Sequence, residues 1–327
     1  MNLRYLLLTL LICSIQICHA QDQPKYAKFV QEAWTLYEAK DYSQAAEKYK
    51  EAFDQLNGKA YPSDRYNAAC SYALADDPEN AFYHLFYLAE NPKIKYNKLE
   101  MIMADQDLLA LHKNKRWSAL IQLVKANKEE YEKDLNKPLV ALLDTIHQDD
   151  QQYRAQIDEY EKKYGWQSEE MQILWNTIHL KDSINLIKVT KILEEFGWLG
   201  PQVVGNRGNS TLFLVIQHAN LEVQQKYLPM MREAVTLGNA QASSLALLED
   251  RVALRLGKRQ IYGSQIMRDE ETEEYYVSPL IDPENVNKRR AEVGLGPIEE
   301  YITNWGMTWD LEKHKERTKM LEEKSKE

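Results

Sequence analysis

The chain has few of the residues that cross-link or bend a polypeptide. Its 327 residues include three cysteines, 12 glycines and 10 prolines. So few turn-forming residues indicate long helices rather than many short strands joined by tight turns. Cys13 and Cys18 lie in an apolar N-terminal run, which leaves Cys70 as the one cysteine of the remaining chain. A single thiol cannot form an intramolecular disulfide, so we expect the fold to depend on its core and Cys70 to be a buried apolar filler.

The sequence also lacks a block of basic residues and, after residue 20, any long apolar run. It has 41 lysine and arginine residues against 50 aspartate and glutamate residues, a net charge of −9. An acidic chain without a basic patch does not suit nucleic acid, so we expect no nucleic-acid partner. A membrane-spanning helix needs roughly 20 apolar residues, so no integral membrane segment is expected after residue 20.

The first 20 residues have the parts of a secretory signal peptide. Arg4 precedes an apolar run from Tyr5 to Cys18, and Ala20 stands directly before the polar Gln21. This order of charge, apolar core and small residue is typical of a cleaved signal. We therefore predict an exported bacterial protein, periplasmic or secreted. Loss of Arg4 would leave 40 basic against 50 acidic residues, a net charge of −10.

Residues 21–133 contain two similar segments, 36 positions apart. The matching pairs are Ala33 and Ala69, Leu36 and Tyr72, Ala45 and Ala81, and Tyr49 and Leu85. Asp41 and Asp77 are predicted to cap the second helix of each copy. The segments "AWTLYEAKDYSQAAEKYKEAF" and "YNAACSYALADDPENAFYHLFYLAEN" resemble the tetratricopeptide repeat family. The resemblance implies helix pairs that offer a concave surface to a protein or peptide partner.

Two features of this first domain are open to interpretation. Residues 97–124 depart from the repeat pattern, and we interpret them as a degenerate end unit whose Trp117 packs on the preceding helices. A charged connecting helix then leads to a domain boundary near Asp134. With two good copies, the repeats are interpreted either as a binding surface or as a rigid mount for the second half of the chain.

Residues 134–327 are predicted to form a second helical domain. Apolar residues recur at helical spacing in several long segments. Near residues 259–281, "RQIYGSQIM" and "EYYVSPLI" flank the polar "RDEETE", which predicts a small β-hairpin. The charged tail after Leu311 is expected to be an exposed helix. The predicted fold class is therefore all-α, with a tetratricopeptide-like domain followed by a helical domain that carries one hairpin.

A series of short motifs in the second domain resembles the motif series of an uncharacterised bacterial domain family of unknown function. In chain order the motifs are "DQQYR" at 150–154, "GW" at 197–198, "VG" at 204–205, "IQHA" at 216–219, "LLEDRV" at 247–252, "QIYGSQ" at 260–265 and "GL" at 294–295. The family commonly has Asp after "QHA" and Thr within "YGTQ", where this chain has Asn220 and Ser264. The resemblance gives the location of a site and implies no chemistry.

Polar residues within apolar helices form the candidate site. His218 shares a face with Leu214 and Val215, and Asp250 and Arg251 lie in a nearly all-apolar segment. Because buried charges are costly unless they are paired, we predict an acid–base pair in which Asp250 orients His218. The residues predicted to bind a polar substrate are Gln217, Arg251, Gln260, Tyr262, Gln265, Asp150 and Arg154. The alternative is an internal Asp–Arg–His network that only fixes helix packing.

No cofactor and no metal site is predicted. The chain has no Cys-x-x-Cys, His-Glu-x-x-His or Gly-x-Ser-x-Gly motif. Binding of a metal by His147, His179 and His218 is disfavoured, because isolated imidazoles are a weak metal signal. Residues 205–210 are expected to form a capped turn before a helix that begins near Asn209, rather than an anion site.

The aromatic residues of the second domain are not expected to form a sugar-binding site. Tyr153, Trp166, Trp175 and Trp198 are expected to pack in the core and at hinges rather than to form a platform for a sugar ring.

Two alternative functions are consistent with the whole sequence. One is a protein- or peptide-binding module of the bacterial envelope that acts through the repeats. The other is an extracytoplasmic enzyme of the hydrolase or transferase type, centred on His218 and Asp250.

Overall fold

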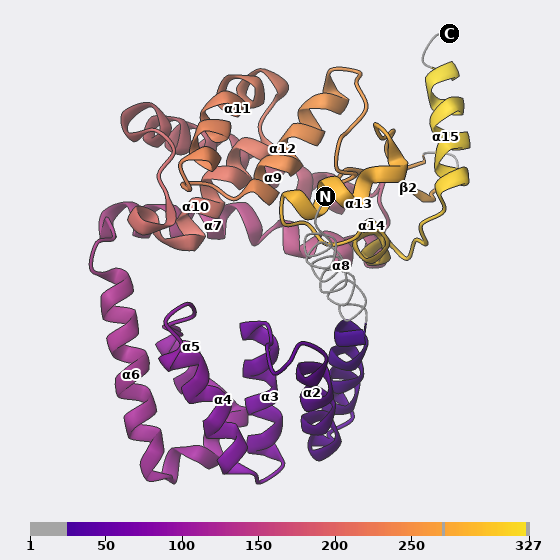
Figure 1. Ribbon diagram of the computed structural model, residues 1–327. Helices are drawn as coiled ribbons and strands as arrows, with labels where there is room; N and C mark the ends of the chain where they lie inside the picture. Colours follow the sequence, from indigo (N-terminus) through magenta and orange to yellow (C-terminus); the bar gives the residue numbers. More distant parts are fainter. Residues whose placement is uncertain (1–24, 270–271, 325–327) are drawn as a thin grey trace, which may run out of the picture. The chain divides into compact units, whose positions relative to one another are not determined.

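The computed structural model describes residues 25–269 and 272–324 (Figure 1). The predicted signal peptide, residues 1–20, lies outside the described residues. The described residues divide into two compact units, with the boundary between Lys133 and Asp134. Within the described residues every regular segment is helical except one two-stranded sheet, which confirms the predicted all-α fold class.

The first unit is a series of antiparallel helices. A helix over residues 25–38 is followed by α2 (Tyr42–Gln55), α3 (Pro62–Leu74), α4 (Pro78–Glu90), α5 (Leu99–Ala104), the 3₁₀ helix η1 (Gln106–Lys113) and α6 (Lys115–Glu132). The side chains of Asp41 and Asp77 accept hydrogen bonds from backbone N–H groups in the first turns of α2 and α4, as predicted. The alanines that recur between the two copies are fully buried, so they allow the helices to approach closely: Ala33, Ala45, Ala69 and Ala81.

The last helices of the first unit pack on the same core. Trp117 of α6 contacts the buried cluster of the preceding helices, as expected from its place in the degenerate segment. Its ring also stacks on His112 of η1, with 4.2 Å between the ring centroids. The buried apolar residues of α3, α4 and α6 therefore form one continuous core.

The second unit begins with a bundle of five long helices. In chain order its elements are α7 (Lys137–Gln151), η2 (Arg154–Gln156), α8 (Ile157–Tyr164), α9 (Glu169–Phe196), α10 (Pro201–His218), α11 (Leu221–Thr236) and α12 (Ala242–Arg255). Buried residues of α7, α9, α10, α11 and α12 form its main core. Helix α10 packs against both α7 and α9, and α7 also packs against α9, so the three helices are in mutual contact.

The predicted hairpin is confirmed. Strand β1 (Ile266–Arg268) pairs antiparallel with β2 (Tyr275–Val277), and Met267 lies opposite Tyr276. The chain continues through η3 (Pro283–Asn285), α13 (Val286–Glu292), α14 (Ile298–Tyr301), η4 (Ile302–Trp305) and α15 (Leu311–Lys324). A small core of its own joins this hairpin to the short helices.

The expectation of a capped turn at residues 205–210 is wrong. A kink at Gly205, where φ is 72° and ψ is 167°, divides α10 into two helices, and the second of them already includes residues 206–210. Gly208 allows α10 to pack closely against α7, because an added Cβ would lie 3.1 Å from a methyl carbon of Leu143 in α7. The Asn209 side chain donates hydrogen bonds to the carbonyls of Leu199 and Asn239. These tertiary contacts stabilise a helix in a segment whose composition is typical of a loop.

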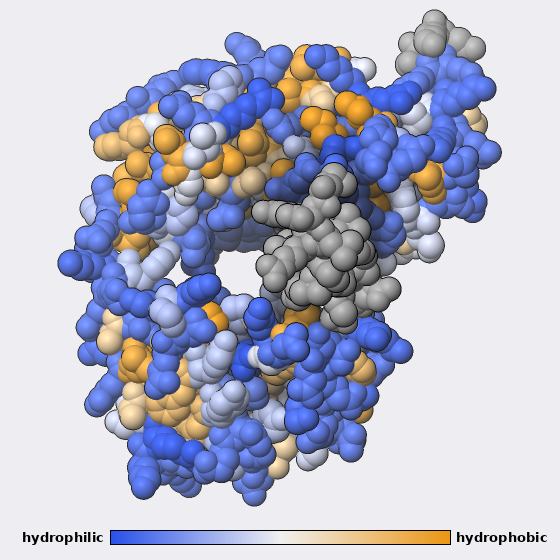
Figure 2. Space-filling view, in the orientation of Figure 1, coloured by the Kyte–Doolittle hydropathy of each residue, from blue (hydrophilic) through white to orange (hydrophobic). Residues whose placement is uncertain are grey.

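The outer faces of the helices carry polar residues together with scattered exposed hydrophobic residues such as Leu180, Ile187 and Leu237. Figure 2 shows a mostly hydrophilic face on which hydrophobic residues gather in several small groups. Across the described ranges, no helix combines the length and the apolar character that crossing a membrane requires.

Candidate functional site

The candidate site lies where α7 and α10 end. His218 is the last residue of α10, and Asp150 lies in the last turn of α7. The Nδ1 atom of His218 is 3.0 Å from Oδ1 of Asp150. The side chain of Asp150 is 1 % exposed and that of His218 is 18 % exposed. The prediction that Asp250 orients His218 is therefore wrong, because Asp150 holds this position.

The neighbours of Asp150 favour its ionised form. Burial alone raises its pKa, but the hydrogen bond and charge of His218 and the charge of Arg154 outweigh burial and hold this pKa below its ordinary value. The Gln151 side chain donates to the other carboxylate oxygen over 2.7 Å. An ionised carboxylate only accepts hydrogen bonds, so the Nδ1 atom of His218 must donate. In the neutral imidazole the lone pair then lies on Nε2.

Arg154 connects this pair to α9. One guanidinium nitrogen, Nη1, donates to the backbone carbonyl of Asp150 and lies 3.4 Å from its Oδ1 atom. The other, Nη2, donates to Oδ2 of Asp182 over 2.8 Å. We call Asp150, Arg154, Asp182 and His218 the His218 cluster.

Some polar atoms of the His218 cluster have no hydrogen-bond partner among the described residues. The Oδ1 atom of Asp182 is buried and unpartnered. The Nε2 atom of His218 is also unpartnered, and it is not among the buried atoms of this kind. The cluster therefore presents one free imidazole nitrogen while the Asp150 side of the ring is fixed.

Residues of α12 hold the end of α10 that carries His218. Arg251 donates to the carbonyl of Gln217, and Arg255 donates to the carbonyl of Ala219. Carbonyls in the last turn of a helix have no partner within the helix, so these two arginines satisfy groups that would otherwise be left open. Burial lowers the pKa of Arg251 to about 10, and the nearby charge of Arg255 contributes to the same shift.

Asp250 has a separate set of partners. Its carboxylate, which is fully buried, accepts hydrogen bonds from the backbone N–H groups of Ile261, Tyr262 and Ser264 over 2.6 to 3.0 Å. Burial raises the pKa of Asp250, and the three N–H donors act in the opposite direction. Both of its oxygens are occupied, so Asp250 anchors the loop at 260–265.

Gln260 completes this loop from inside. Its amide nitrogen donates to the carbonyls of Gln265 and Ser278, and its amide oxygen accepts from the N–H of Gln265. We call the loop at 260–265 with its Asp250 anchor the Asp250 loop. Arg251 connects the two groups, because its Nε atom donates to the Gln265 side chain while Nη1 reaches the end of α10.

The residues predicted from sequence therefore fall into two groups. Asp150, Arg154 and His218 meet in the His218 cluster, whereas Gln260, Tyr262, Gln265 and Asp250 meet in the Asp250 loop. Gln217 is buried and its amide nitrogen lies 3.4 Å from the carbonyl of Leu247. Asp182 was missed, because it lies among other polar residues of an amphipathic helix and no sequence signal distinguishes it.

Single ligand atoms of Asp150, Asp182 and His218 lie within 4.8 Å of one another, as in a metal site. The guanidinium of Arg154 already contacts both carboxylates, so the chain supplies its own cation there. The disfavoured set of His147, His179 and His218 does not form a group within the described residues. His147 instead lies 3.4 Å from the hydroxyl of Thr211.

Comparison with known proteins places both groups in one family region. The model of a family described as "Family of unknown function (DUF6624)" matches residues 133–313. This span contains all residues of the His218 cluster and of the Asp250 loop. No curated protein and no solved structure matches the chain.

Proposed function

The chain belongs to this family of unknown function, and we propose that its second unit is an enzyme of the hydrolase or transferase type with His218 as the general acid–base. The observation that carries the proposal is the contact between Nδ1 of His218 and the buried Asp150, which leaves Nε2 unpartnered. A carboxylate in this position fixes the ring and stabilises the imidazolium that forms when Nε2 takes a proton.

The other members of the His218 cluster support this role without touching the reacting atoms. Arg154 holds the backbone and carboxylate of Asp150 and is itself fixed by Asp182. Arg251 and Arg255 fix the helix end on which His218 lies. These are positioning residues, and Asp250 acts through the loop rather than through the imidazole.

The test is a panel of chromogenic esters, phosphoesters, glycosides and amides, assayed with the chain that begins at Gln21. We expect one class to be turned over, His218→Gln to abolish turnover, and Asp150→Asn to lower kcat by roughly 10²- to 10⁴-fold. His179→Gln is the matched control, because His179 lies outside the His218 cluster. An activity that persists in His218→Gln, or a panel in which no class is turned over, contradicts the proposal.

A measurement that needs no substrate tests the geometry. Long-range ¹H–¹⁵N correlation spectra of histidine-labelled protein report which ring nitrogen carries the proton. We expect His218 to be protonated on Nδ1 in its neutral form and to lose this preference in Asp150→Asn. A ring protonated mainly on Nε2 in the parent chain contradicts the assigned role of Asp150.

We propose a second function for the first unit, which we interpret as tetratricopeptide-like: binding of a protein or peptide partner of the bacterial envelope. The supporting observation is the indole of Trp34, which is 46 % exposed and stacks on Tyr37. We expect Trp34→Ala to weaken capture of a partner from envelope extracts, whereas Leu237→Ala in the second unit leaves capture unchanged. Capture that survives deletion of residues 24–123 contradicts this function.

The proposed location is outside the cytoplasm. It rests on the N-terminal sequence, and it is tested by fractionating cells that express the full chain. We expect the protein in the periplasm or the medium with Gln21 as its first residue, determined by mass spectrometry. A protein that stays in the cytoplasm with its first 20 residues attached contradicts it.

A further inference from the structure

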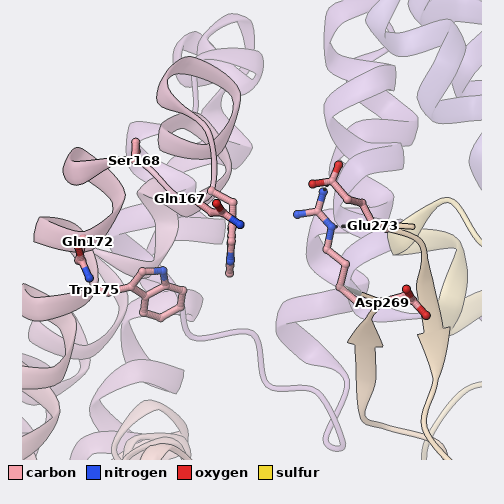
Figure 3. A pocket seen from close by; sticks show the side chains of 8 residues that line it. Gln167, Ser168, Gln172, Trp175, Asp269 and Glu273 are labelled. Atoms are coloured by element: carbon pink, nitrogen blue, oxygen red, sulfur yellow. Dashed lines mark hydrogen bonds and ion pairs between the residues drawn. The ribbon is translucent and has the colours of Figure 1, made fainter. Parts of the chain in front are cut away.

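A cavity of about 810 Å³ lies in the second unit, between the turn that joins α8 to α9 and the β1–β2 hairpin. Trp166, Gln172 and Trp175 line one side, and Arg268 and Glu273 line the other. Figure 3 shows Gln172 and Trp175 on one side, across the gap from Asp269 and Glu273. The volume falls within the range of about 300–1,000 Å³ that is typical of small-molecule sites.

The two tryptophans differ in burial. Trp166 is 47 % exposed, whereas Trp175 is partly buried and packs against a buried cluster of α9 residues. Their rings meet edge to face, with centroids 5.9 Å apart and an interplanar angle of 70°. The expectation that Trp166 packs in the core is therefore wrong. An indole left half in water forgoes the stabilisation that its burial would give, and a ligand ring placed against it would recover it.

The charged side chains of the pocket are already paired. Arg268 lies 2.8 Å from Glu161 of α8 and 3.5 Å from Glu273. Asp269 accepts a 2.6 Å hydrogen bond from Arg317 of α15. A cationic ligand held by aromatic rings needs negative charge that is not yet neutralised, and an anionic ligand needs positive charge. This balance favours a neutral ligand that offers many hydrogen-bonding groups.

We propose that this pocket binds a neutral carbohydrate. The apolar C–H face of a pyranose suits the exposed indole of Trp166, with Trp175 at its edge. The amides of Gln167 and Gln172 and the carboxylate of Glu273 offer donors and acceptors for hydroxyl groups. This binding does not depend on the acid–base role of His218, because no residue of the His218 cluster lines the cavity.

The test is calorimetric titration of the chain from Gln21 with glucose, galactose, mannose and N-acetylglucosamine, and with their 1,4-linked oligomers of two to four units. We expect saturable binding of at least one of these sugars. Trp166→Ala should weaken it about tenfold or more, and Gln172→Ala should weaken it less. Tyr83→Ala is the control, because Tyr83 is an aromatic residue of the first unit with 60 % exposure.

Three results overturn the proposal. The first is the absence of binding across this sugar panel. The second is binding of choline, lysine or uronic acids in preference to every neutral sugar, which would show that net charge selects the ligand. The third is sugar binding that Trp166→Ala leaves unchanged. Circular dichroism of Trp166→Ala and of the milder Trp166→Phe separates lost binding from lost folding.

Discussion

At the scale of single residues, the candidate site depends on which acid reaches His218. Asp150 and Asp250 are both buried, but the sequence favours Asp250, because Asp250 lies in a nearly all-apolar segment whereas Asp150 follows several polar residues. Chain distance also favours Asp250, because Asp150 is further from His218 in sequence than Asp250 is. The ends of α7 and α10 meet through packing, which places Asp150 at the ring. The sequence could therefore predict that His218, Asp150 and Arg154 are site residues but not how they are paired.

The ionisation of Asp150 is expected to make the folded chain less stable at low pH. Its pKa is lower in the folded chain than in the unfolded chain, so its ionised form stabilises the fold above the unfolded pKa. This contribution is lost as the pH falls through the folded pKa. We expect Asp150→Asn to cost about 3 kcal/mol at pH 7, and the difference from the parent chain to shrink below about pH 4.

Urea unfolding of the parent chain and of Asp150→Asn at a series of pH values from 7 to 3 measures this difference. Glu194→Gln is the control, because Glu194 and its partner Lys226 are each 60 % exposed and such pairs contribute little. A difference in the free energy of unfolding between the parent and Asp150→Asn that stays constant down to pH 3 would contradict the lowered pKa of Asp150.

Cys70 is predicted to be chemically inert in the native chain. It is 4 % exposed, and burial raises the pKa of its thiol, with the neighbouring carboxylates of Asp105 and Asp107 adding to the shift. Because the thiolate is the reactive form, labelling by a thiol reagent should be negligible without denaturant and complete in urea. The chain from Gln21 has no other cysteine. In a disulfide-exchange assay, the absorbance of the released thiolate therefore reports the reaction of Cys70 alone. Rapid native labelling would contradict the buried position.

At the scale of elements, most helices could be predicted, but the helical form of residues 206–210 could not. Apolar spacing is a local property, so it predicted most long helices, and the aspartates at the turns between helices predicted the two caps. The segment at 205–210 reads as a loop because Gly and Asn favour turns. Its helical form depends on Gly208 facing α7 and on Asn209 reaching two distant carbonyls, and neither contact is visible in the sequence.

Gly205 is predicted to be irreplaceable at the interruption of α10. Its φ of 72° and ψ of 167° fall in a region that is essentially restricted to glycine. We expect Gly205→Ala to destabilise the second unit by about 1–3 kcal/mol in urea unfolding. Gly296→Ala is the matched control, since Gly296 has no positive φ and the nearest atom to an added Cβ is 3.9 Å away. Equal costs for the two substitutions would contradict the strain argument.

At the scale of the whole molecule, the two units have separate cores. No buried cluster of the described residues includes members from both units. Composition and repeat spacing were sufficient to predict a largely helical chain, because both depend on local pattern. The pairing of helix ends and the cavity beside the hairpin depend on packing between distant segments, which the sequence alone does not supply.

Separate cores predict two unfolding transitions in scanning calorimetry. Asp250→Ala removes the acceptor for three backbone N–H groups that are buried or partly buried, so we expect it to lower the transition temperature of the second unit alone. Ala69→Leu overfills a fully buried position of the first unit and should lower the other transition. A single transition that both substitutions shift equally would show that the units unfold together.

Helix α9 carries residues of both the cavity and the His218 cluster. It has 28 residues and contains neither glycine nor proline, so it is a stiff rod about 42 Å long. Trp175 lines the cavity, and Asp182, two turns further along the same face, holds Arg154. The two positions are about 10 Å apart along the helix axis. The cavity and the His218 cluster are therefore separate sites that share one unbroken helix as their support.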